Sequence, residues 1–396
     1  MHSIEATYRI NTPMFIAGAN QQEAELRLPS FKGALRFWWR ALAYGRYQWD
    51  LAQIREKEDE IFGSTKGQAK LLFHLKANLD CWPKGNDKAL PERFGGLAYL
   101  GYGVCESFTS RNRNSVRGRL TRSCIKPSQE FKVDILWNNN KIDKFSKECI
   151  LLKDALKILG LLGGLGSKSR KGYGSLTLIS MVENQESCFN NPKTREEFEK
   201  TLLDILTPTS FSENIPLYSA FSHHTRIELL KKDHDSLVLL NNVGEVLQQY
   251  RGWYTEKNFK DDHDIAQEIA NDGVSHQHPR RIIFGLPHNY YFSSINKNVD
   301  FNANGNGIGR RSSPLIFHIH FYANNDYEAI ALILKSDFLP NVVKINARRN
   351  LIENKVDYSV LHEFIDGRIG PRDNKTKEYY FPNRLTILGK QVNKEG

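Results

Sequence analysis

LPSFKGALRFWWRALA, residues 28–43, is the stretch that decides the first part of the fold. Phe31, Leu35, Trp38 and Leu42 recur at the spacing of one helical face, which predicts an amphipathic helix over residues 30–44. Apolar side chains at this spacing usually enter a core, so we expect this face to pack against the rest of the protein.

Three cations form a second stripe on the same helix. Lys32, Arg36 and Arg40 recur every four residues, and Trp39 sits beside them. Cations contact phosphates and flat aromatic rings stack on bases, so we predict that these four residues bind single-stranded RNA. A solvated charged face is the simpler alternative for the cations, and Trp39 could brace the helix instead of stacking.

A glycine-rich loop occupies the middle of LGLLGGLGSKSRKGYGSLTL, residues 159–178. Lys168, Arg170 and Lys171 lie among its glycines. Glycines let backbone amides approach a polyanion and the cations add attraction, so we predict RNA contacts from these three side chains. A flexible, solvated connector is the alternative. The glycines expected to shape the loop are Gly163, Gly164, Gly166, Gly172 and Gly174.

The glycine-rich loop does not fit a nucleotide-triphosphate site. It follows a helical pattern that Ser146 can cap, and it precedes a strand-like run at residues 175–182. A Walker loop runs from strand to helix and ends in Gly-Lys-Ser or Gly-Lys-Thr, whereas residues 166–169 read Gly-Ser-Lys-Ser.

The composition favours a polyanionic partner. The chain has 396 residues, enough for about two or three domains, and a formal net charge of +10 with a pI near 9.2. Its five cysteines contain no Cys-x-x-Cys pair, which argues against a disulfide framework or a cysteine zinc site. The N-terminus lacks the apolar core of a secretory signal, and no apolar run reaches the ~18 residues of a membrane span. We expect a cytoplasmic protein without membrane contact.

The first half of the chain predicts one βαββαβ unit. Strands are expected at residues 4–10, 69–75, 131–137 and 175–182, with helices at residues 30–44 and directly before the glycine-rich loop. This order is ferredoxin-like, and RNA-recognition motifs share it. We assign residues 1–182 to an N-terminal domain.

A long basic insertion, residues 78–130, separates the second and third of these strands. Residues 107–129 contain no acidic side chain. Arg113 and Arg117 therefore suit a loop that follows a phosphate backbone and becomes ordered on binding. A charge run that only solvates the loop is the alternative.

Residues 183–396 are assigned to a C-terminal domain that begins with a polar linker and a short helix. Strands are expected at residues 217–230, 281–292, 314–322 and 327–335, the last two as a hairpin, and helices at residues 236–250, 262–270 and 357–365. The predicted fold class is α+β, with two tandem ferredoxin-like (RRM-like) domains that carry long inserted loops. One such loop ends in Arg310 and Arg311, which are further RNA-binding candidates.

Two adjacent histidines, His223 and His224, raise an enzymatic alternative, because histidine suits acid–base chemistry near neutral pH. Neighbouring strand residues point to opposite faces, so only one of the two could enter a site. The sequence places no partner base beside either ring, and we predict no catalytic residue.

Two other groups have the side chains of metal ligands. His318 and His320 share one strand face, and an acidic patch covers residues 261–268. We expect the histidines on the exposed face of a half-buried strand, and the carboxylates at a helix start, where they complement the helix dipole. A metal needs three or four ligands, which the spacing does not supply, so no metal or other cofactor is predicted.

The start of the chain and the glycine-rich loop together resemble the RAMP superfamily of CRISPR proteins. The resemblance rests on TPMFIAGANQQEAELRLPSFKGALRFWWRALA, residues 12–43, and LGGLGSKSRKGYGSLTL, residues 162–178. It extends to FSHHTRIEL, RRIIFGLP and RRSSPLIFHI in the second half. Within the superfamily, the chain is most similar to the first-numbered RAMP subunits of the type III-B Cmr effector complex.

This resemblance implies a non-catalytic subunit that assembles with other RAMP subunits on a CRISPR guide RNA. It also implies a place near the 3′ end of the guide, where the subunit helps to engage complementary target RNA in antiviral defence. In that family, target cleavage is assigned to the repeated backbone subunit. The alternatives are a metal-independent endoribonuclease that processes CRISPR transcripts, and a pure interaction protein whose basic surface contacts acidic partners.

Overall fold

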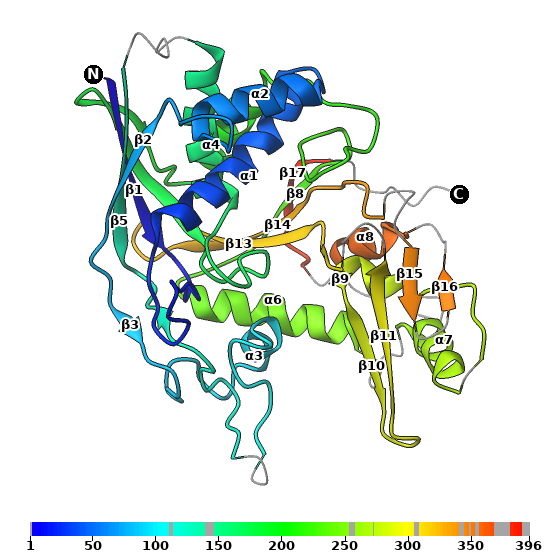
Figure 1. The fold of residues 1–396 in the computed structure, drawn as a ribbon. Helices are drawn as coiled ribbons and strands as arrows, with labels where there is room; N and C mark the ends of the chain where they lie inside the picture. Colours follow the sequence, from blue (N-terminus) through cyan, green and yellow to red (C-terminus); the bar gives the residue numbers. More distant parts are fainter. Residues whose placement is uncertain are drawn as a thin grey trace.

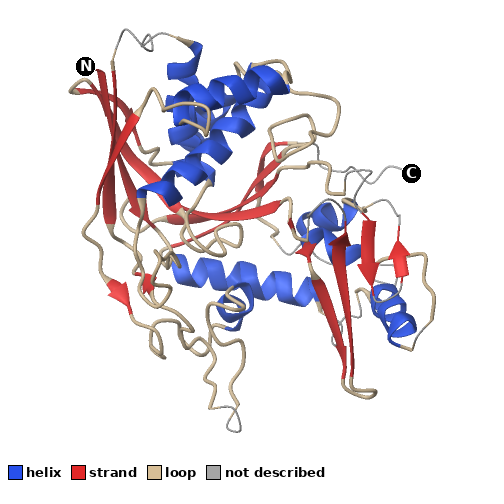
Figure 2. Cartoon of the chain, in the orientation of Figure 1, coloured by secondary structure: helices blue, strands red, loops and turns tan. Residues whose placement is uncertain are grey.

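Antiparallel sheets and the helices that cover them make up this mixed α/β protein (Figure 1, Figure 2). The computed structural model describes residues 2–110, 114–138, 146–252, 258–271, 273–304, 309–339, 344–347, 350–352, 356–367 and 381–389. None of the helices in these ranges combines the length and the apolar character that crossing a membrane requires.

The first sheet contains five strands in the order β2-β5-β1-β6-β7, and all neighbours are antiparallel. The strands are β1 (His2–Ile10), β2 (Leu72–Lys76), β5 (Glu130–Trp137), β6 (Leu176–Glu183) and β7 (Glu186–Asn190). The four strands predicted in this half are confirmed within a few residues. β7 was not predicted, and its pairing with β6 continues the sheet past the junction expected at residues 182 and 183.

Two helices cover one face of the first sheet, α1 (Leu28–Arg46) and α4 (Lys147–Leu162). Both were predicted, and the hydroxyl oxygen of Ser146 caps α4 by accepting the backbone N–H of Cys149 (3.2 Å). The buried Tyr8 on β1 donates its hydroxyl to the carbonyl of Leu156 on α4 (2.9 Å). The opposite face carries half-exposed lysines in ion pairs, such as Lys132 with Glu5 (2.8 Å). The first sheet therefore has one covered and one polar face.

Other elements extend the first half. They are α2 (Leu51–Phe62), β3 (Cys81–Trp82), α3 (Gly95–Leu100), β4 (Cys124–Ile125) and α5 (Arg195–Leu206). α5 confirms the short helix expected in the linker, whereas α2 and α3 were not predicted. α3 crosses α6 (Ser236–Arg251) very closely, since a Cβ at Gly96 would lie 2.0 Å from the carbonyl oxygen of Asn241.

The second sheet contains four antiparallel strands in the order β13-β14-β8-β17. The strands are β8 (Arg226–Asp233), β13 (Leu315–Phe321), β14 (Tyr327–Ile333) and β17 (Leu385–Leu388). The predicted hairpin is confirmed, and Asn324 and Asn325 adopt the left-handed conformation in its turn (φ 49° and 59°). β8 begins nine residues later than the strand predicted at residue 217, after a segment without regular structure.

Helices and strands of both halves enclose this second sheet. Ile316 and Ile330 face the core built on α1 and α4, whereas Phe317 and Ala331 face the core that contains α6 (Ser236–Arg251) and α8 (Ser359–Asp366). Both helices were predicted. The expectation that β13 is half-exposed is wrong, because packing on both faces buries it from Leu315 to His320.

The remaining elements lie beside α6 and α8 (Figure 1). They are α7 (Lys260–Ala270), the 3-10 turn η1 (Arg280–Phe284), and the strands β9 (Gly285–Leu286), β10 (His288–Phe292), β11 (Lys297–Asn304), β12 (Arg311–Ser312), β15 (Lys344–Ala347) and β16 (Asn350–Ile352). α7 was predicted. The prediction of a single strand at residues 281–292 is wrong for its first residues, which form η1. The carboxylate of Asp262 accepts the backbone N–H groups of Arg280 and Arg281 (2.8 and 2.9 Å) and so fixes a turn there.

Candidate nucleic-acid interface

The glycine-rich loop joins α4 to β6, as predicted, and lies where the two halves of the chain meet. Its backbone is bonded on both sides. Ser167 donates its N–H to the carbonyl of Phe15 (2.7 Å), and Phe317 of β13 donates its N–H to the carbonyl of Arg170 (3.0 Å). The loop is therefore held between the segment that follows β1 and the second sheet.

Close backbone contacts explain the glycines of this loop. Gly174 has φ +61°, and a Cβ there would lie 2.1 Å from the carbonyl oxygen of Leu165. A Cβ at Gly163 would lie 2.5 Å from the indole nitrogen of Trp38. Gly164, Gly166 and Gly172 are comparably confined. These glycines shape the loop by tight packing inside the protein.

Arg170 and Lys168 are positioned at the junction of the halves. The guanidinium of Arg170 donates to the carbonyl of Ser313 (2.8 Å), and its central carbon lies 5.1 Å from the ring centre of Phe37. Burial lowers the pKa of Arg170 to about 10. Burial also lowers the pKa of Lys168, and the positive charges of Arg122 and Arg310 lower it further.

Lys171 is the most strongly desolvated cation of the loop. Its Nζ is buried, with no hydrogen-bond partner among the described residues. Burial, followed by the charges of Arg251, Lys168 and Arg170, lowers its pKa to about 7. Within the described ranges, none of the three loop cations forms an ion pair with a carboxylate. This arrangement leaves positive charge without an anion, which a phosphate group would supply.

The basic insertion and the second half contribute further cations near the loop. Arg122 lines a hollow of about 350 Å³ together with Gly166 and Ser167 of the loop. Arg310 lies close enough to Lys168 to affect its pKa, whereas Arg311 sits on β12, paired with Leu286 of β9.

Of the two arginines predicted to bind RNA in the insertion, Arg117 lies beside α3. Its Nε is buried without a hydrogen-bond partner among the described residues, and its guanidinium lies close to Gly95 at the start of α3. Arg113 lies outside the described residues. The sequence analysis named Arg113 and Arg117 as the RNA-binding candidates of the insertion. In the structure, Arg122 of the insertion lines a hollow together with the loop.

The cationic stripe of α1 faces α2 for most of its length. Lys32 donates to the carbonyl of Phe62 (3.2 Å), and the Nε of Arg36 pairs with the Oε1 of Glu58 (2.8 Å). Arg40 is 46% exposed and lies 3.8 Å from the same carboxylate. Lys32 and Arg36 therefore fasten α1 to α2, and Arg40 is the most accessible member of the stripe.

Trp39 braces the helix and does not present a free ring. It is fully buried, and its ring packs against those of Phe62 and Tyr47. Trp38 is buried as well, against Phe221. The half-buried aromatic residue of this helix is Phe37, which the sequence interpretation had passed over.

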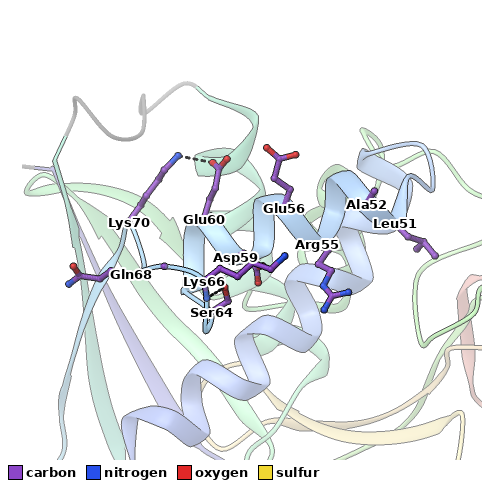
Figure 3. Close-up of a pocket in the computed structure, with 11 residues that line it drawn as sticks. Leu51, Ala52, Arg55, Glu56, Asp59, Glu60, Ser64, Lys66, Gln68 and Lys70 are labelled. Carbon is purple, nitrogen blue, oxygen red and sulfur yellow. Dashed lines mark hydrogen bonds and ion pairs between the residues drawn. The ribbon is translucent and has the colours of Figure 1, made fainter. Parts of the chain in front are cut away.

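Three hollows that share lining residues extend from the loop across α1 to α2. The first, about 180 Å³, lies between Gly163, Arg170 and Phe37. Phe37 also lines the second, about 410 Å³, which shares Leu51 and Arg55 with the third. The third measures about 740 Å³ and has three cations and three carboxylates on its walls. Figure 3 shows Leu51 and Arg55 at one end of it and the Lys70–Glu60 pair at the other.

The histidines give no support to a catalytic site. His223 is half-exposed and pairs with the carboxylate of Glu213 (3.3 Å), while the ring of His224 bonds to the backbone carbonyl of Glu213 (2.7 Å). Asp262 of the acidic patch is buried and pairs with Arg281 (3.1 Å). The described part of the chain contains no group of three or more histidine, cysteine or carboxylate side chains that could bind a metal ion.

The buried histidines of β13 predict acid sensitivity. His318 donates from Nδ1 to the carbonyl of Gly163 (2.8 Å), and burial lowers its pKa to about 3. Because the unfolded chain binds this proton near pH 6.5 and the folded chain does not, stability is lost as the pH falls below 6.5. We expect His318→Gln to reduce the loss of unfolding free energy between pH 7 and pH 5 by about 2 kcal/mol in urea titrations. Equal slopes for the wild type and H318Q would contradict the prediction.

Comparison with known proteins finds sequence relatives and a similar solved structure. The sequence profile of the RAMP superfamily matches residues 7–177. The CRISPR system Cmr subunit Cmr1-1 of Pyrococcus furiosus is 25% identical over 352 residues, which are 86% of this chain and 87% of that protein. The Cmr subunit Cmr1-2 of the same organism is 25% identical over 181 residues, or 43% of this chain and 92% of that protein. The crystal structure of apo Cmr1 from Pyrococcus furiosus superposes with a TM-score of 0.58 at 18% identity, over 98% of this chain and 99% of that one, and so shares the fold.

Proposed function

Because the sequence profile of the RAMP superfamily matches residues 7–177, we propose that the chain is a non-catalytic RNA-binding subunit of a type III-B Cmr CRISPR effector complex. Its partners are the CRISPR guide RNA, complementary target RNA and the other RAMP subunits. It acts near the 3′ end of the guide and helps to engage the target in antiviral defence. The similarity to a Cmr subunit over 86% of the chain supports this assignment.

The strand order supports two tandem ferredoxin-like domains, which we assign to residues 1–182 and 183–396. When β7 at the edge of the first sheet is left aside and the four remaining strands of each sheet are numbered along the chain, both sheets read 2-3-1-4. A helix follows the first and third strand in each case, α1 and α4 in the first half and α6 and α8 in the second. This is the order that a βαββαβ unit requires. Long insertions interrupt both units.

One observation carries the RNA-binding assignment. Lys168, Arg170 and Lys171 are held at the junction of the two halves, largely removed from water, and without a carboxylate partner among the described residues. Burying uncompensated charge is unfavourable for a free protein, and an RNA phosphate compensates it. The predicted roles of Lys32, Arg36 and Arg40 require an RNA strand that passes the loop and follows α1, where Arg40 is the accessible cation.

The test is recovery of the chain from its native host with an affinity tag. We expect other RAMP subunits and short RNAs that share a repeat-derived end to be purified with it. Ultraviolet cross-linking within the recovered complex should place RNA on the glycine-rich loop. Recovery of the chain alone and without RNA, under low-salt conditions that preserve weak complexes, would contradict the proposal.

A second experiment tests the nuclease alternative. The purified chain, mixed with CRISPR transcript and a chelator, should not cleave the RNA. Cleavage that is lost in the His223→Ala or His224→Ala variant would favour the nuclease alternative.

A further inference from the structure

Phe37 stands between two hollows on the surface of α1. It is half-buried, and it lines both the hollow beside the glycine-rich loop and the 410 Å³ groove between α1 and α2. Arg170 lies over the ring, 5.1 Å from its centre. A flat aromatic surface is therefore placed directly beside a loop cation.

Tyr218 provides a second aromatic side chain in the same groove. Its hydroxyl donates to the carbonyl of Arg40 (3.3 Å), and its ring packs edge-on against Tyr44 at 5.5 Å, so its position is fixed. Leu51 and Ile54 complete the apolar lining. The volume falls within the range of roughly 300–1,000 Å³ that is typical of small-molecule sites.

The charges around the groove favour an anionic ligand with a flat apolar part. Arg40 and Arg55 line the groove and are exposed, whereas its carboxylate, Glu58, is buried and already paired with Arg36 (2.8 Å). Positive charge therefore predominates at the accessible rim. A peptide with acidic residues would satisfy the charges, but flat rings flanked by arginines match a nucleobase with its phosphates more completely.

We propose that the groove between α1 and α2 holds one unstacked base of single-stranded RNA, stacked on Phe37 and Tyr218. The phosphate on one side of this nucleotide lies at Arg170, and the phosphate on the other side lies at Arg40. The site rests on the proposed RNA-binding function and gives it a base-stacking position that is separate from the loop cations. Sequence reasoning placed this role on Trp39, which is buried.

The test compares two ligands of equal charge. The full-length chain is titrated into fluorescently labelled RNA of ten uridines, and into a ribose-phosphate chain of the same length without bases, at several salt concentrations. We expect the wild type to bind the uridine RNA about tenfold more tightly, because stacking adds to the phosphate contacts. Phe37→Leu and Tyr218→Leu should bind both ligands equally, with the salt dependence of the wild type.

Phe73→Leu is the matched control. Phe73 is also half-buried and also carries a cation over its ring, Lys32 at 5.1 Å, but it lines none of the hollows along α1. This variant should keep the preference for uridine RNA.

The failures of the two proposals can be told apart. Equal binding of both ligands by the wild type would overturn the stacking site and leave the RNA-binding function intact. No binding of either ligand would count against both. Loss of other subunits from the complex on Phe37→Leu, with the uridine preference retained, would reassign the groove to a protein contact.

Discussion

Replacement of Lys168, Arg170 and Lys171 together by alanine is expected to lower the affinity for single-stranded RNA by about 100-fold at low salt. The three cations lie on one loop at the junction of the halves and have no carboxylate to compete for them within the described residues. Each phosphate contact on a single strand releases about 0.7 of a counterion, so the slope of log affinity against log salt should decrease by about 2. Fluorescence anisotropy over a salt series measures both quantities.

The effect of this variant on folding has two opposing parts. Burial lowers the pKa of Lys171 to about 7, so removing its charge should stabilise the folded state at neutral pH, whereas removing Arg170 loses its hydrogen bond to the carbonyl of Ser313 (2.8 Å). A control variant with Lys76, Lys132 and Lys260 changed to alanine removes the same charge from residues that pair with Asp134, Glu5 and Asp264. If both variants weaken RNA binding equally, net charge rather than the loop determines affinity.

Replacement of Arg226 by methionine should lower the free energy of unfolding by about 3–5 kcal/mol. Arg226 is 1% exposed at the start of β8. Its guanidinium donates two parallel hydrogen bonds to Asp366 of α8 (2.6 and 2.7 Å) and one to the fully buried Glu228 (2.6 Å). Without it, Glu228 and Asp366 lose this partner, and the hydrogen bonds that remain to them among the described residues come from Thr386 and Arg384.

Urea unfolding followed by tryptophan fluorescence measures this loss. The matched control is Lys132→Met, which breaks an ion pair of similar length (2.8 Å) between half-exposed side chains and should cost less than about 1 kcal/mol. A loss below 1 kcal/mol for R226M would mean that Arg384 compensates both carboxylates.

Periodicity and capping predicted the elements that have one buried face. The helix around Trp38 and the Ser146 cap of α4 appear as expected, and so does the asparagine turn between β13 and β14. α2 was missed because its sequence, LAQIREKEDEIF, contains few apolar residues, and the packing of Ile54, Ile61 and Phe62 on α1 stabilises it. Local pattern does not reveal that contact.

The site errors have a common cause, which is burial by another element of the fold. Residues 37–39 are Phe-Trp-Trp, and each could have been the exposed ring. Phe221, in the segment before β8, covers Trp38, and Phe62 of α2 covers Trp39, so Phe37 remains at the surface. His318 and His320 were misplaced for the same reason, because α4 and α5 pack over the strand face on which they lie. Sequence spacing describes one element at a time and contains no information about a second layer.

The pairing of distant segments has a consequence for biosynthesis. The amide of Asn11 donates to the carbonyl of Ile319, 308 residues further along the chain (2.7 Å), and β17 completes the second sheet only near the C-terminus. At translation rates of about 5–20 residues per second, the nascent N-terminal half waits on the order of 15–60 s for this partner. During that interval the apolar surface that α1 and α4 present to the second half of the chain is open to solvent on the ribosome, which makes the emerging chain a client for holding chaperones.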